Sequence, residues 1–388
     1  MEKFEQKPSQ EKISEYQDLR GLDLSERDLR TVSSEVLVTA DFDTKTVWPK
    51  QDRLPIGFNP EKVIEEAKNP GLGIRELHQE GIDGRGVTVA IIDQTLSSEQ
   101  GELMPHSEYA RNIVDYKEYG DAKDEDVSMH GPAVASLLIG KTCGVAPGAE
   151  LVYKATPSSR VFELRARALM DIVETNKTAE PDKKVRVVSC SIGYWERSPE
   201  PGLDQWIDAI KKAEEEGIIV VDVSYRNDIN LTGGGAYGDK ESVDNYEEAL
   251  FARDSKDEDL ERLISQKDTD GVLKRLRETQ SERFVNVPDA DLRKEIEENL
   301  FEKRQRIIIP SDYRTMASYA GPDEYMYNGK GGMSWSVPYL AGLFALALQL
   351  DPNLTKKEIA DAINETASEN KKGLRAVNPK GFIEALRK

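Results

Sequence analysis

Short, nearly continuous apolar runs recur along the chain, separated by segments in which apolar positions follow a different spacing. The runs have the length and composition of strands buried on both faces of a sheet. They are Val87–Ile92, Leu151–Ala155, Val185–Cys190 and Ile218–Val223. Helical spacing of apolar residues marks the segments 161–173, 202–216 and 354–367. This alternation predicts an α/β fold, with a doubly wound, mainly parallel sheet and helices on both of its faces.

The same pattern divides the chain into a main domain and an N-terminal segment. Residues 1–70 are read as a polar N-terminal extension, in which leucines recur near five-residue spacing between Leu19 and Leu29. The run is too short to predict a repeat structure. Residues 71–388 form the main domain, and whether the extension inhibits that domain stays open.

A charged insertion is predicted inside the main domain at about 236–306. Of the 68 residues from Asp239 to Arg306, 34 are charged, with short amphipathic pieces among them. This composition predicts a mainly helical, solvent-facing insertion. A solvated structural lobe is the simplest interpretation, and a substrate gate or a docking arm for a protein partner are the alternatives. The sheet pattern resumes at Arg306–Ile309.

Charge and cysteine content narrow the classes of partner and compartment. The formal net charge of -19 argues against nucleic acid or an anionic membrane as the main partner, because both attract basic surfaces. The first residues have no apolar secretory core, and no apolar run is expected to reach the roughly 18 residues of a spanning helix. Cys143 and Cys190 lie in apolar surroundings without the spacing of a metal site. We expect buried free thiols and a cytoplasmic protein.

No cofactor is expected to be required. The acidic segment Asp121–Asp126 could bind calcium, but it lacks the full ligand pattern of a calcium loop, which favours a solvated acidic loop. The glycine-rich segment Gly329–Gly332 lacks the spacing of a phosphate-binding loop.

Ser334 follows this glycine-rich turn and precedes the longest apolar run of the chain. Pro338 is expected to open the helix, because proline is tolerated in a first helical turn. The serine would then lie beside unpaired N–H groups and the positive end of the helix dipole, where an oxyanion is stabilised. A serine at such a position also serves as an ordinary helix cap. Taken alone, the position favours the cap.

His130 and Asp93 also lie at the ends of predicted elements. His130 begins a run of small and apolar residues that predicts a tightly packed helix, whereas His78 and His106 are expected to be surface residues. Asp93 ends a buried strand, at the sheet edge where open α/β folds place their sites. A serine needs a base to remove its proton, and the base needs a carboxylate to fix its tautomer. The three residues together therefore favour nucleophilic catalysis.

Four stretches resemble, in order, the signature blocks of the subtilisin-like serine peptidases (subtilases). They are Gly84–Asp93, His130–Leu151, Val188–Gly193 and Gly332–Gly342. The resemblance covers about residues 71–235 and 306–388. It implies a subtilisin-like fold and hydrolysis of peptide bonds through an acyl-enzyme intermediate.

The resemblance also implies roles for single residues. Asp93, His130 and Ser334 match the family's catalytic Asp, His and Ser. The segment formed by Ser191, Ile192 and Gly193 matches the one whose backbone pairs with an extended polypeptide substrate.

The chain departs from the family pattern at several positions close to the implied site. Gln94-Thr95, Pro132-Ala133 and the residues that flank Ser334 differ from the usual ones. The family has an asparagine oxyanion donor after a strand like 217–223, and ungapped counting puts Arg226 at that position. A bulge would bring in Asn227, which is the preferred assignment. These departures keep two alternatives open: a catalytically impaired scaffold that binds or regulates a partner, and a hydrolase of esters or small amides.

Overall fold

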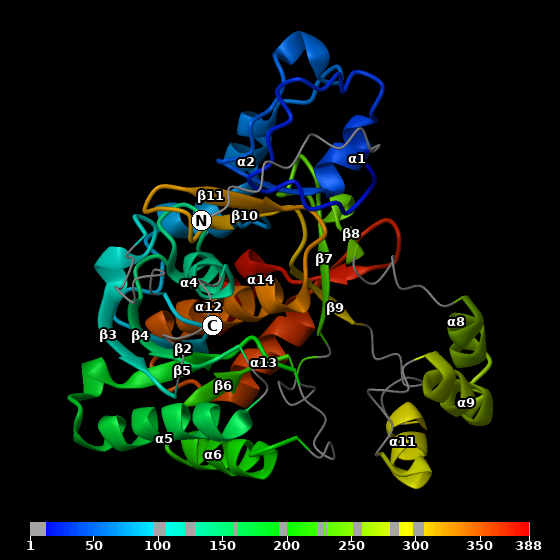
Figure 1. The fold of residues 1–388 in the computed structure, drawn as a ribbon. Helices are drawn as coiled ribbons and strands as arrows, with labels where there is room; N and C mark the ends of the chain where they lie inside the picture. Colours follow the sequence, from blue (N-terminus) through cyan, green and yellow to red (C-terminus); the bar gives the residue numbers. More distant parts are fainter. Residues whose placement is uncertain are drawn as a thin grey trace.

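The computed structural model has a five-stranded parallel sheet at its centre (Figure 1). It describes residues 13–96, 106–120, 129–158, 161–193, 200–223, 229, 231–250, 258–279, 287–297 and 306–387. The strand order is β3-β4-β2-β5-β6, and every neighbouring pair is parallel. The strands are β2 (Thr88–Asp93), β3 (Ile113–Glu118), β4 (Glu150–Ala155), β5 (Val185–Ser189) and β6 (Ile219–Val221).

Helices cover both faces of this sheet. They are needed on both faces because apolar side chains of the central strand β2 point alternately to one face and to the other. On β2, Val89 and Ile91 pack into one apolar cluster, whereas Ala90 and Ile92 pack into another, because successive side chains point to opposite faces. Figure 1 shows α5 and α6 below the sheet and α4 and α12 above it. These helices are α4 (His130–Ile139), α5 (Phe162–Thr178), α6 (Leu203–Glu215) and α12 (Met333–Leu350). The predicted doubly wound α/β fold is confirmed.

Helix α12 is the core helix of the domain. It has 18 residues, no charged side chain, and 78% of its length buried inside the protein. The prediction that no apolar run reaches membrane-spanning length is wrong, because Met333–Leu350 reaches it. Among the residues that the structure describes, this is the one helix that meets that criterion, and its burial identifies it as a core helix. It begins five residues before Pro338, which therefore lies inside the helix and does not open it.

Two smaller sheets and three short helices complete the main domain. One sheet has the order β12-β13-β9-β7-β8, and the other has the order β1-β11-β10. Their strands are β1 (Asp41–Asp43), β7 (Leu231–Gly235), β8 (Glu247–Glu248), β9 (Ile307–Pro310), β10 (Arg314–Ala317), β11 (Tyr325–Asn328), β12 (Ser368–Glu369) and β13 (Arg375–Ala376). The helices are α3 (Ile74–Gln79), α13 (Lys356–Thr366) and α14 (Pro379–Leu386). Single 3-10 turns occupy Gln51–Arg53, Ala110–Asn112, Pro181–Lys183 and Val243–Asn245.

The N-terminal segment, residues 13–70, contributes most of an apolar cluster that Tyr327 of the main domain completes. The cluster includes Leu19, Leu24 and Leu29, whose backbone N–H groups donate to the carbonyls of Asp41, Val47 and Arg53. The five-residue spacing thus places each of these leucine side chains in the apolar cluster. The helices α1 (Ser34–Thr39) and α2 (Pro60–Ala67) close the segment, and β1 joins it to the main domain by pairing with β11.

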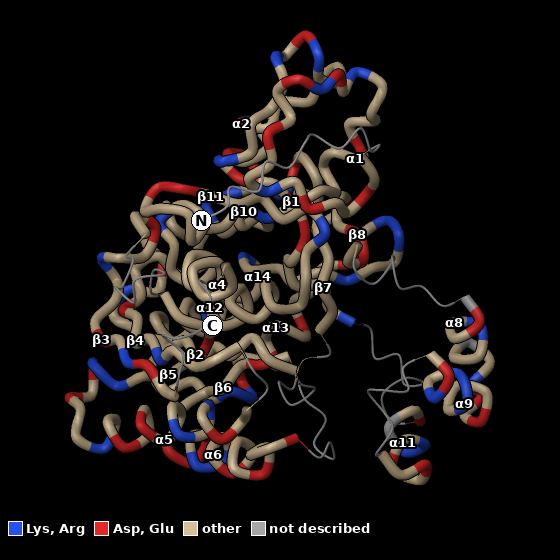
Figure 2. Tube along the Cα trace, in the orientation of Figure 1, with Lys and Arg blue, Asp and Glu red and all other residues tan. Residues whose placement is uncertain are grey.

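The charged region that follows β7 falls into two parts. Residues 236–250 pack on the main domain, since Tyr246 is fully buried and β8 extends a sheet of that domain. Beyond them, α8 (Glu258–Ser265), α9 (Thr269–Thr279) and α11 (Asp289–Glu295) lie to one side of the domain and carry many charged residues (Figures 1 and 2). These helices share a small cluster of six buried apolar residues. It comprises Val272, Leu273, Leu276, Val287, Leu292 and Ile296.

Candidate active site

Asp93 and His130 form a close hydrogen-bonded pair at the carboxyl edge of the central sheet. The Nδ1 atom of His130 lies 2.6 Å from Oδ1 of Asp93. The carboxylate is 6% exposed, and the same oxygen accepts a hydrogen bond of 2.8 Å from the backbone N–H of Gln94. Because Nδ1 donates to a buried carboxylate, the lone pair of the neutral imidazole is on Nε2.

Gly131 explains why a helix can begin so close to the end of β2. A Cβ atom at this position would lie 2.4 Å from the carbonyl oxygen of Gln94 and 2.7 Å from that of Thr95. Any side chain would therefore push α4 away from the loop after Asp93. The missing side chain lets the first residue of α4, His130, reach the carboxylate.

The electrostatics of the pair favour a protonatable ring. Burial acts to lower the pKa of His130, but the adjacent Asp93 carboxylate outweighs it through its charge and its hydrogen bond. The pKa of His130 is therefore raised above its ordinary value. An imidazole in this state accepts a proton readily and is held in one orientation while it does so.

Ser334 is the second residue of α12 and is half-buried. In a regular helix its carbonyl would accept the N–H of the residue four positions later, but that residue is Pro338, which has none. The hydroxyl of Ser191 donates to the Ser334 carbonyl instead, at 2.9 Å. The loop after β5 is thus joined directly to the backbone of Ser334.

Trp335 brings the start of α12 against the imidazole. Its ring centroid lies 5.1 Å from that of His130, and its Nε1–H donates to Oδ1 of Asn328 at 3.1 Å. Trp335 directly follows Ser334, so the N-termini of α4 and α12 meet beside the Asp93–His130 pair. Sequence reasoning noted Trp335 only as a departure from the family pattern and did not single out Asn328. The asparagine at the end of an apolar strand before the glycines was the available signal.

The predicted substrate segment directly follows β5. Ser191, Ile192 and Gly193 are all half-buried. The Ile192 carbonyl accepts from Val223 N–H at 3.1 Å, and the Ile192 N–H donates to Cys190 at 2.7 Å. The predicted oxyanion residues, Arg226 and Asn227, lie outside the described residues.

The remaining candidates concern thiols, other histidines and metals. Cys143 and Cys190 are buried and free, as expected, and burial raises the pKa of both thiols. His106 is 2% exposed and His78 is half-buried, so neither is the surface residue that was predicted. Over the described ranges, no group of three or more His, Cys, Asp or Glu side chains is arranged to hold a metal ion. The acidic segment 121–126 lies outside those ranges.

Comparison with known proteins identifies the architecture. The Subtilase family, Peptidase S8, matches residues 84–245. The structure described as "Structural basis of subtilase cytotoxin SubAB assembly" aligns with a TM-score of 0.51 and 13% identity, over 82% of this chain and 95% of that one. A protease from Pseudoalteromonas arctica PAMC 21717 aligns with a TM-score of 0.50 and 15% identity, over 84% of this chain and 98% of that one.

At these identities the structural likeness establishes the fold. The doubly wound sheet, with an Asp–His pair at its carboxyl edge and a serine in the first turn of the core helix, defines the class as subtilisin-like. The family match agrees with this fold and covers residues 84–245, which is less than half of the chain.

Proposed function

We propose that the protein is a serine endopeptidase that cleaves polypeptides through an acyl-enzyme intermediate. The match of residues 84–245 to the Subtilase family supports this proposal. The observation that carries it is the 2.6 Å contact between Asp93 and His130 next to the helix start that bears Ser334.

In the proposed reaction the Ser334 hydroxyl attacks the scissile carbonyl while Nε2 of His130 takes its proton. The protonated ring then gives that proton to the leaving amine, and water later hydrolyses the acyl-enzyme by the same steps in reverse. Asp93 fixes the ring and stabilises its cationic form. The carboxylate itself keeps its charge throughout.

Stabilisation of the oxyanion is assigned to groups at the start of α12. The helix begins at Met333, so N–H groups of its first turn and the positive end of its dipole lie beside Ser334. We assign the side-chain donor to Asn227. Loss of one such donor costs about 100- to 1000-fold in turnover in comparable sites.

An extended polypeptide is the proposed substrate. Ser191, Ile192 and Gly193 form an edge next to the backbone of Ser334, and an extended chain could pair with it as an added strand.

The test compares two serines of the same helix. Ser334→Ala is expected to abolish both cleavage of an unfolded protein and labelling by a fluorophosphonate. Ser336→Ala is the matched control, because its hydroxyl is buried and donates to the Ile309 carbonyl at 3.0 Å. It should keep labelling within about twofold.

Three outcomes would contradict the proposal. Retention of cleavage by Ser334→Ala would remove the serine from the mechanism. A folded wild-type protein that neither cleaves nor becomes labelled would instead favour the non-catalytic scaffold, and turnover of esters without turnover of long peptides would favour an esterase.

A further inference from the structure

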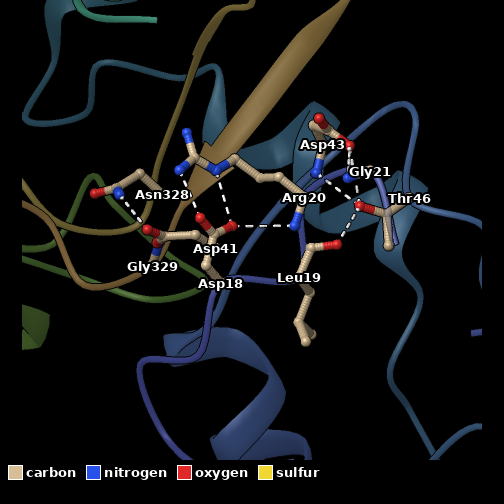
Figure 3. Close-up of polar contacts among 9 residues, drawn as sticks. All are labelled: Asp18, Leu19, Arg20, Gly21, Asp41, Asp43, Thr46, Asn328 and Gly329. Atoms are coloured by element: carbon tan, nitrogen blue, oxygen red, sulfur yellow. Dashed lines mark hydrogen bonds and ion pairs between the residues drawn. The ribbon is translucent and has the colours of Figure 1, made fainter. Parts of the chain in front are cut away.

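The carboxylate of Asp41, in the N-terminal segment, binds the turn that precedes Ser334 (Figure 3). Strand β1 pairs with β11 in antiparallel register, with Asp41 opposite Asn328. Oδ1 of Asp41 accepts the Gly329 N–H at 3.0 Å, and Oδ2 accepts Nδ2 of Asn328 at 2.9 Å. Both oxygens of this carboxylate therefore bind the start of the glycine-rich turn.

The other end of the Asn328 amide faces the site. Its Oδ1 accepts the Gly331 N–H at 2.7 Å and Nε1–H of Trp335 at 3.1 Å. Trp335 in turn packs its ring on His130. One amide thus connects Asp41 with Gly331 and Trp335, which lie on either side of the segment 332–334.

The orientation of that amide depends on Asp41. An asparagine can turn its amide by half a rotation, which exchanges its oxygen and nitrogen positions. A turned amide would place its NH₂ group against two donors, Gly331 N–H and Trp335 Nε1–H, and its oxygen against the Asp41 carboxylate. With Asp41 ionised, only the observed orientation lets the Asn328 NH₂ group donate to the Asp41 carboxylate. Only in this orientation does the Asn328 oxygen accept from both the Gly331 N–H and the Trp335 Nε1–H.

Asp41 is ionised under the conditions where such a site would work. Burial raises the pKa of Asp41 to about 6, although the nearby charge of Arg20 and the Gly329 N–H act to lower it. Arg20 itself is held by Asp18 through a two-pronged ion pair, with its Nη2 at 2.6 Å from Oδ2. At pH 7.5 the carboxylate is therefore mostly charged and accepts both hydrogen bonds.

We propose that Asp41 is a positioning residue for Ser334, acting through the Asn328 amide, and that the N-terminal segment is an integral part of the active site. This inference rests on the proposed function. The sequence leaves open whether the N-terminal segment inhibits the main domain. Under this inference the segment supports turnover and does not inhibit it.

We call the hydrogen-bonded series Asp41–Asn328–Trp335 the relay. Exchanging the side chains of Asp41 and Asn328 tests it in the full-length protein. Asp41→Asn should turn the Asn328 amide or leave two NH₂ groups facing each other. Asn328→Asp should place two carboxylates face to face. Each is expected to lower kcat by about tenfold or more with KM changed by less than about twofold, because displacement of a reacting group by a fraction of an ångström is costly.

Combining the two changes restores every hydrogen bond. In the double variant, the new amide at position 41 donates to the carboxylate at 328 and accepts the Gly329 N–H. That carboxylate accepts the Gly331 N–H and Trp335 Nε1–H. We expect kcat and the rate of Ser334 labelling to return to within about threefold of wild type, a non-additivity expected of contacting groups.

Asp43→Asn is the matched control on the same strand. Oδ1 of Asp43 accepts hydrogen bonds from Gly21, Lys45 and Thr46, all inside the N-terminal segment. It should lower thermal stability without changing kcat per folded molecule.

The outcomes separate this inference from the proposed function. If wild-type Ser334 is not labelled, the proposed function fails and this inference with it. If wild type is labelled but Asp41→Asn labels as fast as Asp43→Asn, only the positioning role is overturned. Should Asp41→Asn fail to fold, the double variant decides: folded and fast labelling supports the role, and folded but slow labelling overturns it.

Discussion

A proline and a serine far apart in the chain solve one local problem near the candidate nucleophile. Pro338 removes the N–H that would satisfy the Ser334 carbonyl, and Ser191 supplies a hydroxyl in its place. Pro338 is predicted in the first helical turn because that is where proline costs least. The helix is five residues longer than predicted, since the compensating donor comes from the loop after β5.

The protonation of His130 gives a prediction at the same scale. In the proposed mechanism the neutral imidazole is the base, and the Asp93 carboxylate raises the pKa of His130 above the ordinary 6.5. The acid limb of kcat/KM against pH should therefore have its midpoint above 6.5. In Asp93→Asn the pairing is lost and burial dominates, so the limb should move to lower pH while kcat falls by about 10,000-fold. A pH profile of both enzymes checks this, and an unmoved limb would contradict it.

The same shift has a consequence for stability whose sign follows from linkage. The protonated ring is favoured in the folded state, so its contribution is fully present below the unfolded pKa. It is lost as pH rises through the folded pKa of His130.

At the scale of elements, the turn between β11 and α12 depends on a glycine without alternatives. Gly331 has a φ of 77°, and a Cβ atom there would lie 2.0 Å from Oδ1 of Asp312. Asp312 cannot move aside easily, because its carboxylate accepts hydrogen bonds from Ser311 and from the Leu250 N–H. The turn thus combines a left-handed backbone with a close contact.

Comparison of two glycines separates these effects. Gly373 has a φ of 75° with nothing within 4 Å of an added Cβ, so Gly373→Ala should cost only the backbone penalty of about 1–2 kcal/mol. Gly331→Ala should cost more and should also slow Ser334 labelling. Chemical denaturation measures the first effect and labelling at equal folded fraction the second. Equal losses at both positions would refute the importance of the contact.

The elements that sequence could predict are those with a regular apolar pattern. The strand expected at 151–155 is observed at Glu150–Ala155, and the helix expected at 202–216 at Leu203–Glu215. Strand β3, Ile113–Glu118, escaped notice because it is the edge strand and has polar residues within it. Asp93 and His130 were found because they end and begin such regular elements. Trp335, Asn328 and Asp41 were not, because their roles depend on the pairing of β1 with a strand 287 residues away.

At the scale of the whole molecule, the helices α8, α9 and α11 have their own small apolar cluster and are connected to the domain at both ends. The attachment points follow β8 and precede β9, two strands that lie on either side of β7 in one sheet. The simplest interpretation remains a solvated lobe whose folding is separate from that of the central sheet.

Excision of the lobe tests this interpretation. Residues 251–305 are replaced by a flexible glycine-serine linker of about eight residues. A linker of this length can cross the two strand spacings that separate the end of β8 from the start of β9. We expect the melting temperature to change by only a few degrees and turnover of a small ester to stay within about twofold, by calorimetry and kinetics. Faster cleavage of long polypeptides would indicate a gate, and loss of folding would show that the lobe is part of the domain.

The pairing of β1 with β11 also sets the order of events during synthesis. Asp41 leaves the ribosome early, but Asn328 follows 287 residues later, which takes roughly 15–60 s at ordinary elongation rates. Until then β1 has no partner strand, and the relay that holds the Ser334 turn does not exist. In the proposed mechanism, a nascent chain therefore acquires its catalytic site only after almost all of it has been translated, and until then it could cleave neither itself nor its neighbours.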